Sequence, residues 1–142
     1  MINDMQKLPD KELTDQIISA AIQVHKTLGP GFIESAYEEA LCIEFDFLKI
    51  PYERQKTVTV KYRERPIIQH RLDIFVDNRV VVENKSIHKI EQIHFAIVSS
   101  YMKAVNASSG LLLNFGSMPL TIKRVYRESI DFTLSNNTPA DF

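Results

Sequence analysis

The sequence has one cysteine, few glycines and no long apolar run, and each of these absences removes a class of protein. Cys42 has no partner for an internal disulfide, so a reducing cytoplasm is the expected location. The apolar stretches are short and interrupted by charges, so we expect no segment that crosses a bilayer. The opening sequence, MINDMQKLPDKEL, lacks the apolar centre of a secretion signal, which argues against secretion.

Several common catalytic patterns are missing as well. The chain has no Gly-rich phosphate loop, no Ser/His/Asp arrangement and no zinc-type cysteine cluster. Its four histidines show no metal-ligand spacing. His94 could approach a site from a helix, but packing or surface exposure is the commoner role for such a residue.

Charge is almost balanced, with 17 Lys and Arg against 18 Asp and Glu and a net charge of −1. The molecule as a whole is therefore no electrostatic trap for nucleic acid, and any phosphate binding must come from local clustering. One candidate cluster combines Lys123, Arg124 and Arg127 with Arg63 and Arg65, although such residues usually form a solvated face.

The 142 residues, 44% of them hydrophobic, suit one core. We expect a single domain over residues 1–134 and a flexible tail over 135–142.

The periodicity predicts helices first and strands afterwards. A helix should begin near Pro9 and Asp10, with Asp10 as its cap, and end near Leu28, before the break at Gly29-Pro30-Gly31. A second helix is expected over residues 34–48. From residue 52 the period becomes two, and three strands should follow, with a polar turn at 63–66 and a hairpin at Asp77-Asn78.

The last third of the chain predicts one more helix and two strands. Residues 89–106 have helical spacing, with Ile90, Ile93, Ile97 and Tyr101 in one stripe. Residues 110–115 (GLLLNF) indicate a buried strand, and 120–126 a final edge strand. This order predicts an α/β (α+β mixed) fold in which helices cover both faces of a mixed central sheet.

Two predicted neighbouring strands carry a charged constellation. Glu83 and Lys85 are two residues apart, so they project from the same face of a strand, and Asp73 lies in the strand before it. Two carboxylates that approach closely repel each other unless a cation lies between them. A hard cation such as Mg²⁺ suits oxygen ligands, and Lys85 could hold an attacking water beside it.

The length of the hairpin loop decides whether these residues meet. A turn made of Asp77 and Asn78 alone would place residue 73 opposite residue 82, and Glu83 would then point to the other face. We therefore predict a three-residue loop, Asp77-Asn78-Arg79, or one bulge. The alternative is that Glu83 and Lys85 form a surface charge pair and Asp73 is solvated, because Glu-x-Lys occurs by chance in many proteins.

At these positions the sequence resembles the GxxExxY proteins. Residues 28–38, LGPGFIESAYE, contain the motif as Gly31, Glu34 and Tyr37. The similarity extends from about residue 15 to 125, in the expected order and spacing, through residues 52–55 (YERQ), 71–73 (RLD), the Glu83-x-Lys85 pair and residues 110–115. This family is placed in the PD-(D/E)XK nuclease superfamily, so the resemblance implies a restriction-endonuclease-like core.

The resemblance also implies roles for individual residues. Asp73 and Glu83 would bind Mg²⁺ or Mn²⁺, and the main-chain carbonyl of Asn84 would also face the metal. Lys85 would be the catalytic lysine, and Glu34 the acidic residue contributed by the preceding helix. The expected activity is hydrolysis of phosphodiesters in nucleic acid, with DNA preferred to RNA, and a homodimer is compatible with it because nucleases of this fold often act as pairs.

The sequence departs from the family pattern at two positions. The residue between Glu83 and Lys85 is the polar Asn84, where the family usually has an apolar one. The position four residues before Tyr101 is Ile97, where the family usually has a glutamine thought to support the active site. The missing glutamine and the near-zero net charge favour the alternative, a catalytically weak binding or scaffold module that keeps the nuclease fold.

Overall fold

A computed structural model describes residues 8–127. The expected tail at 135–142 lies outside the described residues. The elements follow in the expected order: α1 (Lys11–Leu28), α2 (Glu34–Leu48), β1 (Tyr52–Tyr62), β2 (Arg65–Val76), β3 (Val80–Lys85), α3 (Gln92–Val105), β4 (Ser109–Asn114) and β5 (Thr121–Tyr126). Within this described part, no helix is long and apolar enough to cross a membrane.

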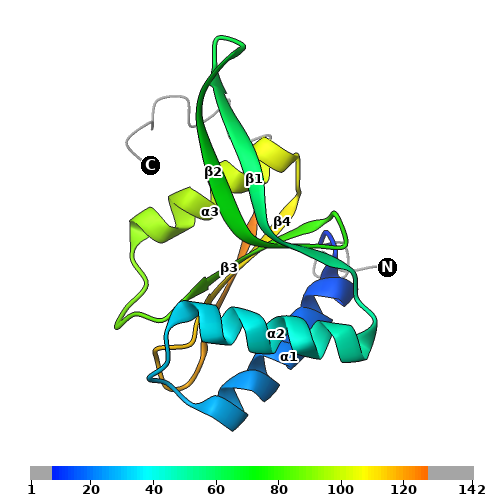
Figure 1. The fold of residues 1–142 in the computed structure, drawn as a ribbon, viewed down its shortest axis with the longest axis vertical. Helices are drawn as coiled ribbons and strands as arrows, with labels where there is room; N and C mark the ends of the chain where they lie inside the picture. Colours follow the sequence, from blue (N-terminus) through cyan, green and yellow to red (C-terminus); the bar gives the residue numbers. More distant parts are fainter. Residues whose placement is uncertain (1–7, 128–142) are drawn as a thin grey trace.

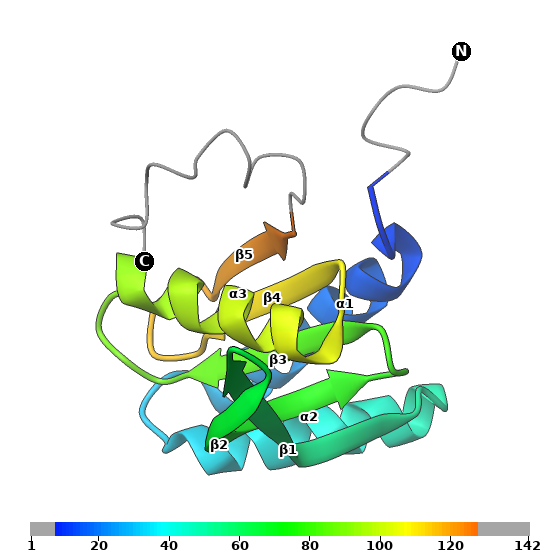
Figure 2. The ribbon, with the colours of Figure 1, turned by 90° about the horizontal axis from the view of Figure 1, so that it is seen from above.

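The five strands form one mixed sheet in the order β1-β2-β3-β4-β5. Only β3 and β4 run parallel; the other neighbours are antiparallel. The connection between the parallel strands contains α3, which covers one face, while α1 and α2 cover the other, as Figure 2 makes visible. The predicted mixed sheet with helices on both faces is confirmed, and so is the edge position of the last strand.

Two apolar cores lie on the two faces of the sheet. The core on the α1 and α2 side contains Ile17, Tyr37, Phe45, Val82 and Leu113 among others. The core on the α3 side is smaller and is built around Val81, Val98, Met102, Leu112 and Val125 together with residues of β1 and β2. β3 and β4 are buried on both faces because each strand contributes alternate side chains to both cores.

Two local predictions need correction. Asp10 stands at the N-cap of α1, but it has a left-handed backbone (φ 55°) and makes no side-chain cap; its carboxylate instead contacts Arg79 at 3.3 Å. β2 begins at Arg65 rather than after a longer turn, because Arg63 and Glu64 take positive φ values and close the hairpin alone. In α3 the buried residues are Val98 and Met102, and Ile93 of the stripe found in the sequence is 54% exposed.

β1 and β2 are longer than the rest of the sheet needs. The pairing of β2 with β3 ends at Ile74 and Val82, whereas its pairing with β1 continues to Arg65 and Tyr62. Beyond the end of the β2–β3 pairing the two strands project as a ribbon, residues 56–72, which we call the arm (Figure 1). The sheet therefore forks, with β2 following β1 on one side and β3 following β4 on the other.

Candidate functional site

The fork between β2 and β3 brings Asp73 next to Glu83. The hairpin loop has three residues, Asp77-Asn78-Arg79, as the sequence analysis required, since Val76 pairs with Val80. Continuing this register places Asp73 opposite Glu83, one position beyond the last pair. Asp73 Oδ2 accepts a hydrogen bond of 2.8 Å from the backbone N–H of Asn84, so its side chain bridges the gap that the separating strands leave.

β2 changes face at Asp73. Ile74 and Val76 pack in the core on the α1 and α2 side, but Leu72 packs in the core on the α3 side. In a regular strand residues 72, 74 and 76 would share one face. Neither Asp73 nor Gln55, which would pair with it, belongs to the β1–β2 ladder, and Gln55 has a φ of 52°. This irregularity turns the arm away from β3 and leaves Asp73 at the fork.

Glu83 and Lys85 meet on the α3 side of β3. Val81, two residues before Glu83, packs in that core, and the alternation of the strand places Glu83 and Lys85 on the same face. Lys85 Nζ lies 3.8 Å from Glu83 Oε2, and both side chains are largely buried. Glu83 Oε1 is also buried and has no hydrogen-bond partner among the described residues.

Burial and like charge make both carboxyls hard to ionise. Burial is the main cause that raises the pKa of Asp73, followed by the charges of Glu38 and Glu34, while the Asn84 hydrogen bond and Lys85 lower it. For Glu83, burial again raises the pKa most, the charge of Asp73 raises it further and Lys85 opposes both. Two such carboxyls are destabilised in their ionised form unless a cation neutralises them.

The residues at the fork fit a hard divalent cation. Two carboxylates, one of them with an unpaired buried oxygen, and the main-chain carbonyl of Asn84 are oxygen donors of the type that Mg²⁺ prefers, with water completing the set. Among residues 8–127, no three His, Cys, Asp or Glu side chains gather closely enough to hold a metal by themselves. Since Mg²⁺ is commonly bound through one or two carboxylates and substrate phosphates, two carboxylates suffice.

Glu34 lies in the first turn of α2 and is exposed. Its charge nevertheless raises the pKa of both Asp73 and Glu83, so it is within electrostatic reach of the fork. A carboxylate in the first helical turn is also favoured by the helix dipole. The position of Glu34 is therefore compatible both with an acidic role at the site and with a purely local role as a carboxylate that stabilises the start of α2.

Glu38 is an acidic neighbour of the site that the sequence analysis missed. It lies one turn after Glu34 and is only 5% exposed. Its carboxylate accepts hydrogen bonds from Arg54 Nε at 3.0 Å and Gln55 Nε2 at 2.9 Å. The spacing of four residues from Glu34 was the available signal, because residues at that spacing share one face of a helix.

Tyr37 has a structural role. Its side chain is fully buried, its hydroxyl donates to the Gly29 carbonyl at 2.5 Å, and it accepts from the Phe32 N–H at 3.1 Å. Its ring stacks on Phe115 at 4.6 Å. The loop of the GxxExxY motif is thus tied to the core, and Ser86 at the end of β3 adds a hydrogen bond of 2.7 Å to the Phe32 carbonyl.

Other candidate residues are held by local structure. His94 Nδ1 accepts a hydrogen bond from the Glu91 N–H in the capping box of α3. Cys42 is 2% exposed, and burial raises the pKa of its thiol to about 12. Arg124 binds Asp15 and Arg127 binds Asn106 near β5, at the opposite edge of the sheet from the arm with Arg63 and Arg65, so these arginines do not share one groove.

A family model agrees with this architecture. The family model of the PD-(D/E)XK nuclease superfamily matches residues 11–125, and the chain belongs to that superfamily. A solved structure, the crystal structure of SSO0001, is similar with a TM-score of 0.49 at 12% identity, covering 90% of this chain and 76% of that one. A likeness at that level carries no argument about function. No curated protein matches the sequence significantly.

Proposed function

We propose that this protein is a metal-dependent phosphodiester hydrolase that acts on nucleic acid, of the GxxExxY type within its superfamily. The superfamily consists of nucleases, which typically use divalent metals, and this supports the class of reaction. The observation that carries the proposal is the pair of carboxyls at the fork, the buried Glu83 and the half-buried Asp73, with Glu83 Oε1 unpaired among the described residues and Lys85 Nζ 3.8 Å from Glu83 Oε2.

The proposed roles follow from the position of each group. Asp73, Glu83 and the Asn84 carbonyl would hold Mg²⁺ or Mn²⁺, which when bound polarises the phosphate and acidifies a bound water. Lys85 would donate a hydrogen bond to the attacking water and hold it in line with the scissile bond. Glu34 would keep the local field negative and favour cation binding. DNA as the preferred substrate and pairing into a homodimer remain parts of this proposal.

A cleavage assay with matched variants tests the assignment. We expect Asp73→Asn and Lys85→Ala to lose cleavage of DNA and RNA in Mg²⁺ or Mn²⁺ by about a hundredfold or more, the effect of removing a group that stabilises the transition state. Asp77→Asn changes an exposed carboxylate of the same hairpin, and Lys89→Ala an exposed lysine beyond β3. Both controls should cut as the wild type does. Metal-dependent cutting that persists unchanged in Asp73→Asn and Lys85→Ala would reject the assignment.

Ile97 favours the second candidate, a nuclease-fold binding or scaffold module with weak catalysis. This residue is partly buried in α3 and offers no polar group at the position where the family usually has a glutamine. Titration calorimetry separates the candidates. Heat of binding for Mg²⁺ or Mn²⁺ that disappears in Asp73→Asn supports the hydrolase, whereas no binding at millimolar metal supports the scaffold.

A further inference from the structure

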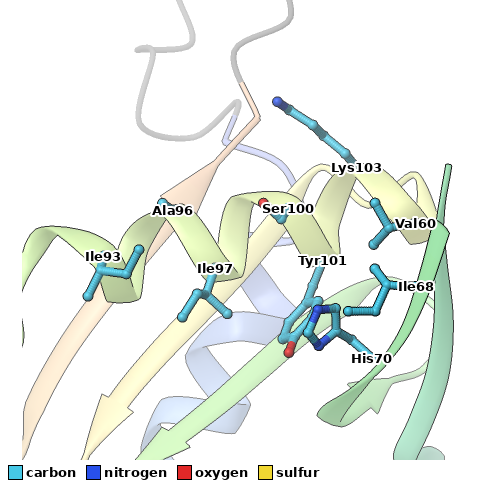
Figure 3. Close-up of a pocket in the computed structure, with 9 residues that line it drawn as sticks. All are labelled: Val60, Ile68, His70, Ile93, Ala96, Ile97, Ser100, Tyr101 and Lys103. Carbon is cyan, nitrogen blue, oxygen red and sulfur yellow. The ribbon is translucent and has the colours of Figure 1, made fainter. Parts of the chain in front are cut away.

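The arm and α3 enclose a groove that the proposed hydrolase centre does not use. It measures about 590 Å³ and is lined mainly by apolar side chains of β1, β2 and α3, among them Val60, Ile68, Ile93 and Ile97 (Figure 3). A second hollow of about 450 Å³ continues it toward the C-terminal end of α3, and shares Val60, Ser100 and Lys103 with the first. Three of the four residues that sequence periodicity placed in one stripe of α3, Ile93, Ile97 and Tyr101, therefore line a groove.

One end of the groove lies close to the fork, because Tyr101 packs against the core that contains Leu72, next to Asp73, and Val81, two residues before Glu83. Tyr101 and His70 line it, with ring centroids 6.1 Å apart, and Figure 3 places the two rings side by side. The pKa of the Tyr101 hydroxyl is raised by burial and then by the charges of Glu83 and Asp73. A polynucleotide with one phosphate at the fork would therefore have its neighbouring nucleotides beside Tyr101 and in the groove.

Charge on the two faces of the molecule is divided unequally. The lining of both hollows contains Lys61, Lys103 and His70 and no carboxylate. The helix α3 has no acidic residue, and the only acidic residue of the arm is Glu64. On the other face, α2 has no basic residue and five acidic ones: Glu34, Glu38, Glu39, Glu44 and Asp46. Although the net charge is near zero, positive charge gathers at the groove and negative charge on α2. A polyanion is therefore attracted to the groove and repelled by α2.

We propose that the groove between the arm and α3 binds unpaired bases of a single-stranded nucleic acid. Its phosphates would lie along the lysines of the lining, Lys61 and Lys103, and continue to the fork. This proposal rests on the proposed function and names its substrate class. Bases within a duplex are stacked on one another and present only their edges, whereas unpaired bases can bury their faces against apolar and aromatic side chains. A groove of isoleucine and valine, ending at two rings, suits the second situation.

Two neighbouring isoleucines of β2 provide the test. Ile68 lines the groove and is 47% exposed, while Ile67 is 63% exposed and is not part of the lining. The binding of a labelled oligothymidylate of about 12 nucleotides, and of a duplex of equal length, is measured by fluorescence anisotropy in EDTA. We expect the wild type to bind the single strand more tightly. Ile68→Glu should weaken this binding about tenfold or more, the loss of one stacked base, and Ile67→Glu should leave it unchanged.

Three results would overturn the groove proposal: duplex bound as tightly as single strand, equal weakening by both variants, or a concentration-dependent dimer that Ile68→Glu dissociates. Because binding is measured without metal, it is separable from catalysis. If the wild type binds the single strand but never cuts it, the hydrolase proposal is wrong and the groove proposal holds. If the wild type cuts with Mg²⁺ but Ile68→Glu binds the single strand as tightly as the wild type does, the groove proposal is wrong and the hydrolase proposal holds. Thermal unfolding of both variants checks that they fold.

Discussion

Asp73 and Glu83 lie opposite each other at the first position where β2 and β3 no longer pair. A backbone N–H that a continuous sheet would satisfy through main-chain pairing is satisfied here by a carboxylate, since Asn84 donates to Asp73 Oδ2. The fork thus couples two properties: the strands separate, and the space between them contains ionisable groups.

Stability without metal should fall as the pH rises. Burial and like charge raise the pKa values of Asp73 and Glu83 in the folded protein, so above the ordinary carboxyl pKa of about 4 the folded state binds more protons than the unfolded state. The free energy of unfolding therefore declines with pH until both groups have ionised. Glu83→Gln removes one of these ionisations, and in EDTA at mildly alkaline pH it should be more stable than the wild type by roughly 1–3 kcal/mol.

Urea denaturation of both proteins across the pH range measures this difference. We expect the two stability curves to converge in acid, where Glu83 is protonated in the wild type, and to separate as the pH rises. A constant difference at every pH would mean that the substitution acts through packing alone.

Added metal should reverse that loss. A cation that binds only the folded state stabilises it by about 1.4 kcal/mol at a concentration ten times its dissociation constant. Thermal unfolding in Mg²⁺ or Mn²⁺ should therefore show a higher midpoint for the wild type and for Asp77→Asn, and no shift for Asp73→Asn. An equal rise in Asp73→Asn would place the cation elsewhere on the molecule.

Sequence alone predicted the register of the hairpin better than its surroundings. The requirement that Asp73 and Glu83 share a face predicted a three-residue loop or a bulge, because the side-chain period of a strand is fixed, and the pairing of Val76 with Val80 confirms the three-residue loop. The groove along α3 was not predictable, since Ile93 and Ile97 have the spacing of core residues and only the position of the arm leaves a groove beside them. The change of face at Asp73 was equally hidden, because it depends on the left-handed backbone of Gln55.

Tyr37→Phe should lower stability more than it lowers catalysis. The substitution keeps the ring stacked on Phe115 but removes the hydroxyl that joins Gly29 and Phe32. Two lost hydrogen bonds in a partly buried loop correspond to about 1–3 kcal/mol. Urea denaturation measures the loss, and the cleavage rate of the protein that remains folded should stay within about threefold of wild type. A stable Tyr37→Phe protein with no cleavage would instead make the hydroxyl a reacting group.

The connection after β3 is held by one buried amide, and its removal should be costly. Asn114 Oδ1 accepts hydrogen bonds from the Ile87 and Gly116 N–H groups at 3.0 Å each, and its Nδ2 donates to the Ile87 carbonyl at 3.0 Å. The two segments are already in close contact, because a Cβ on Gly116 would lie 2.6 Å from the Ile87 oxygen. Asn114→Ala would leave three main-chain groups without their partner.

Each unpaired buried group costs about 1–3 kcal/mol, so Asn114→Ala should destabilise the protein by several kcal/mol unless water enters. Gln92→Ala, which removes an exposed amide at the start of α3, serves as the control and should change stability by less than about 1 kcal/mol. Since Lys85 ends β3 directly before this connection, amide exchange at Ser86 and Ile87 should accelerate in Asn114→Ala, and metal binding should weaken with it. Unchanged exchange at these two amides would mean that the end of β3 is positioned by the Phe115–Lys85 backbone hydrogen bond instead.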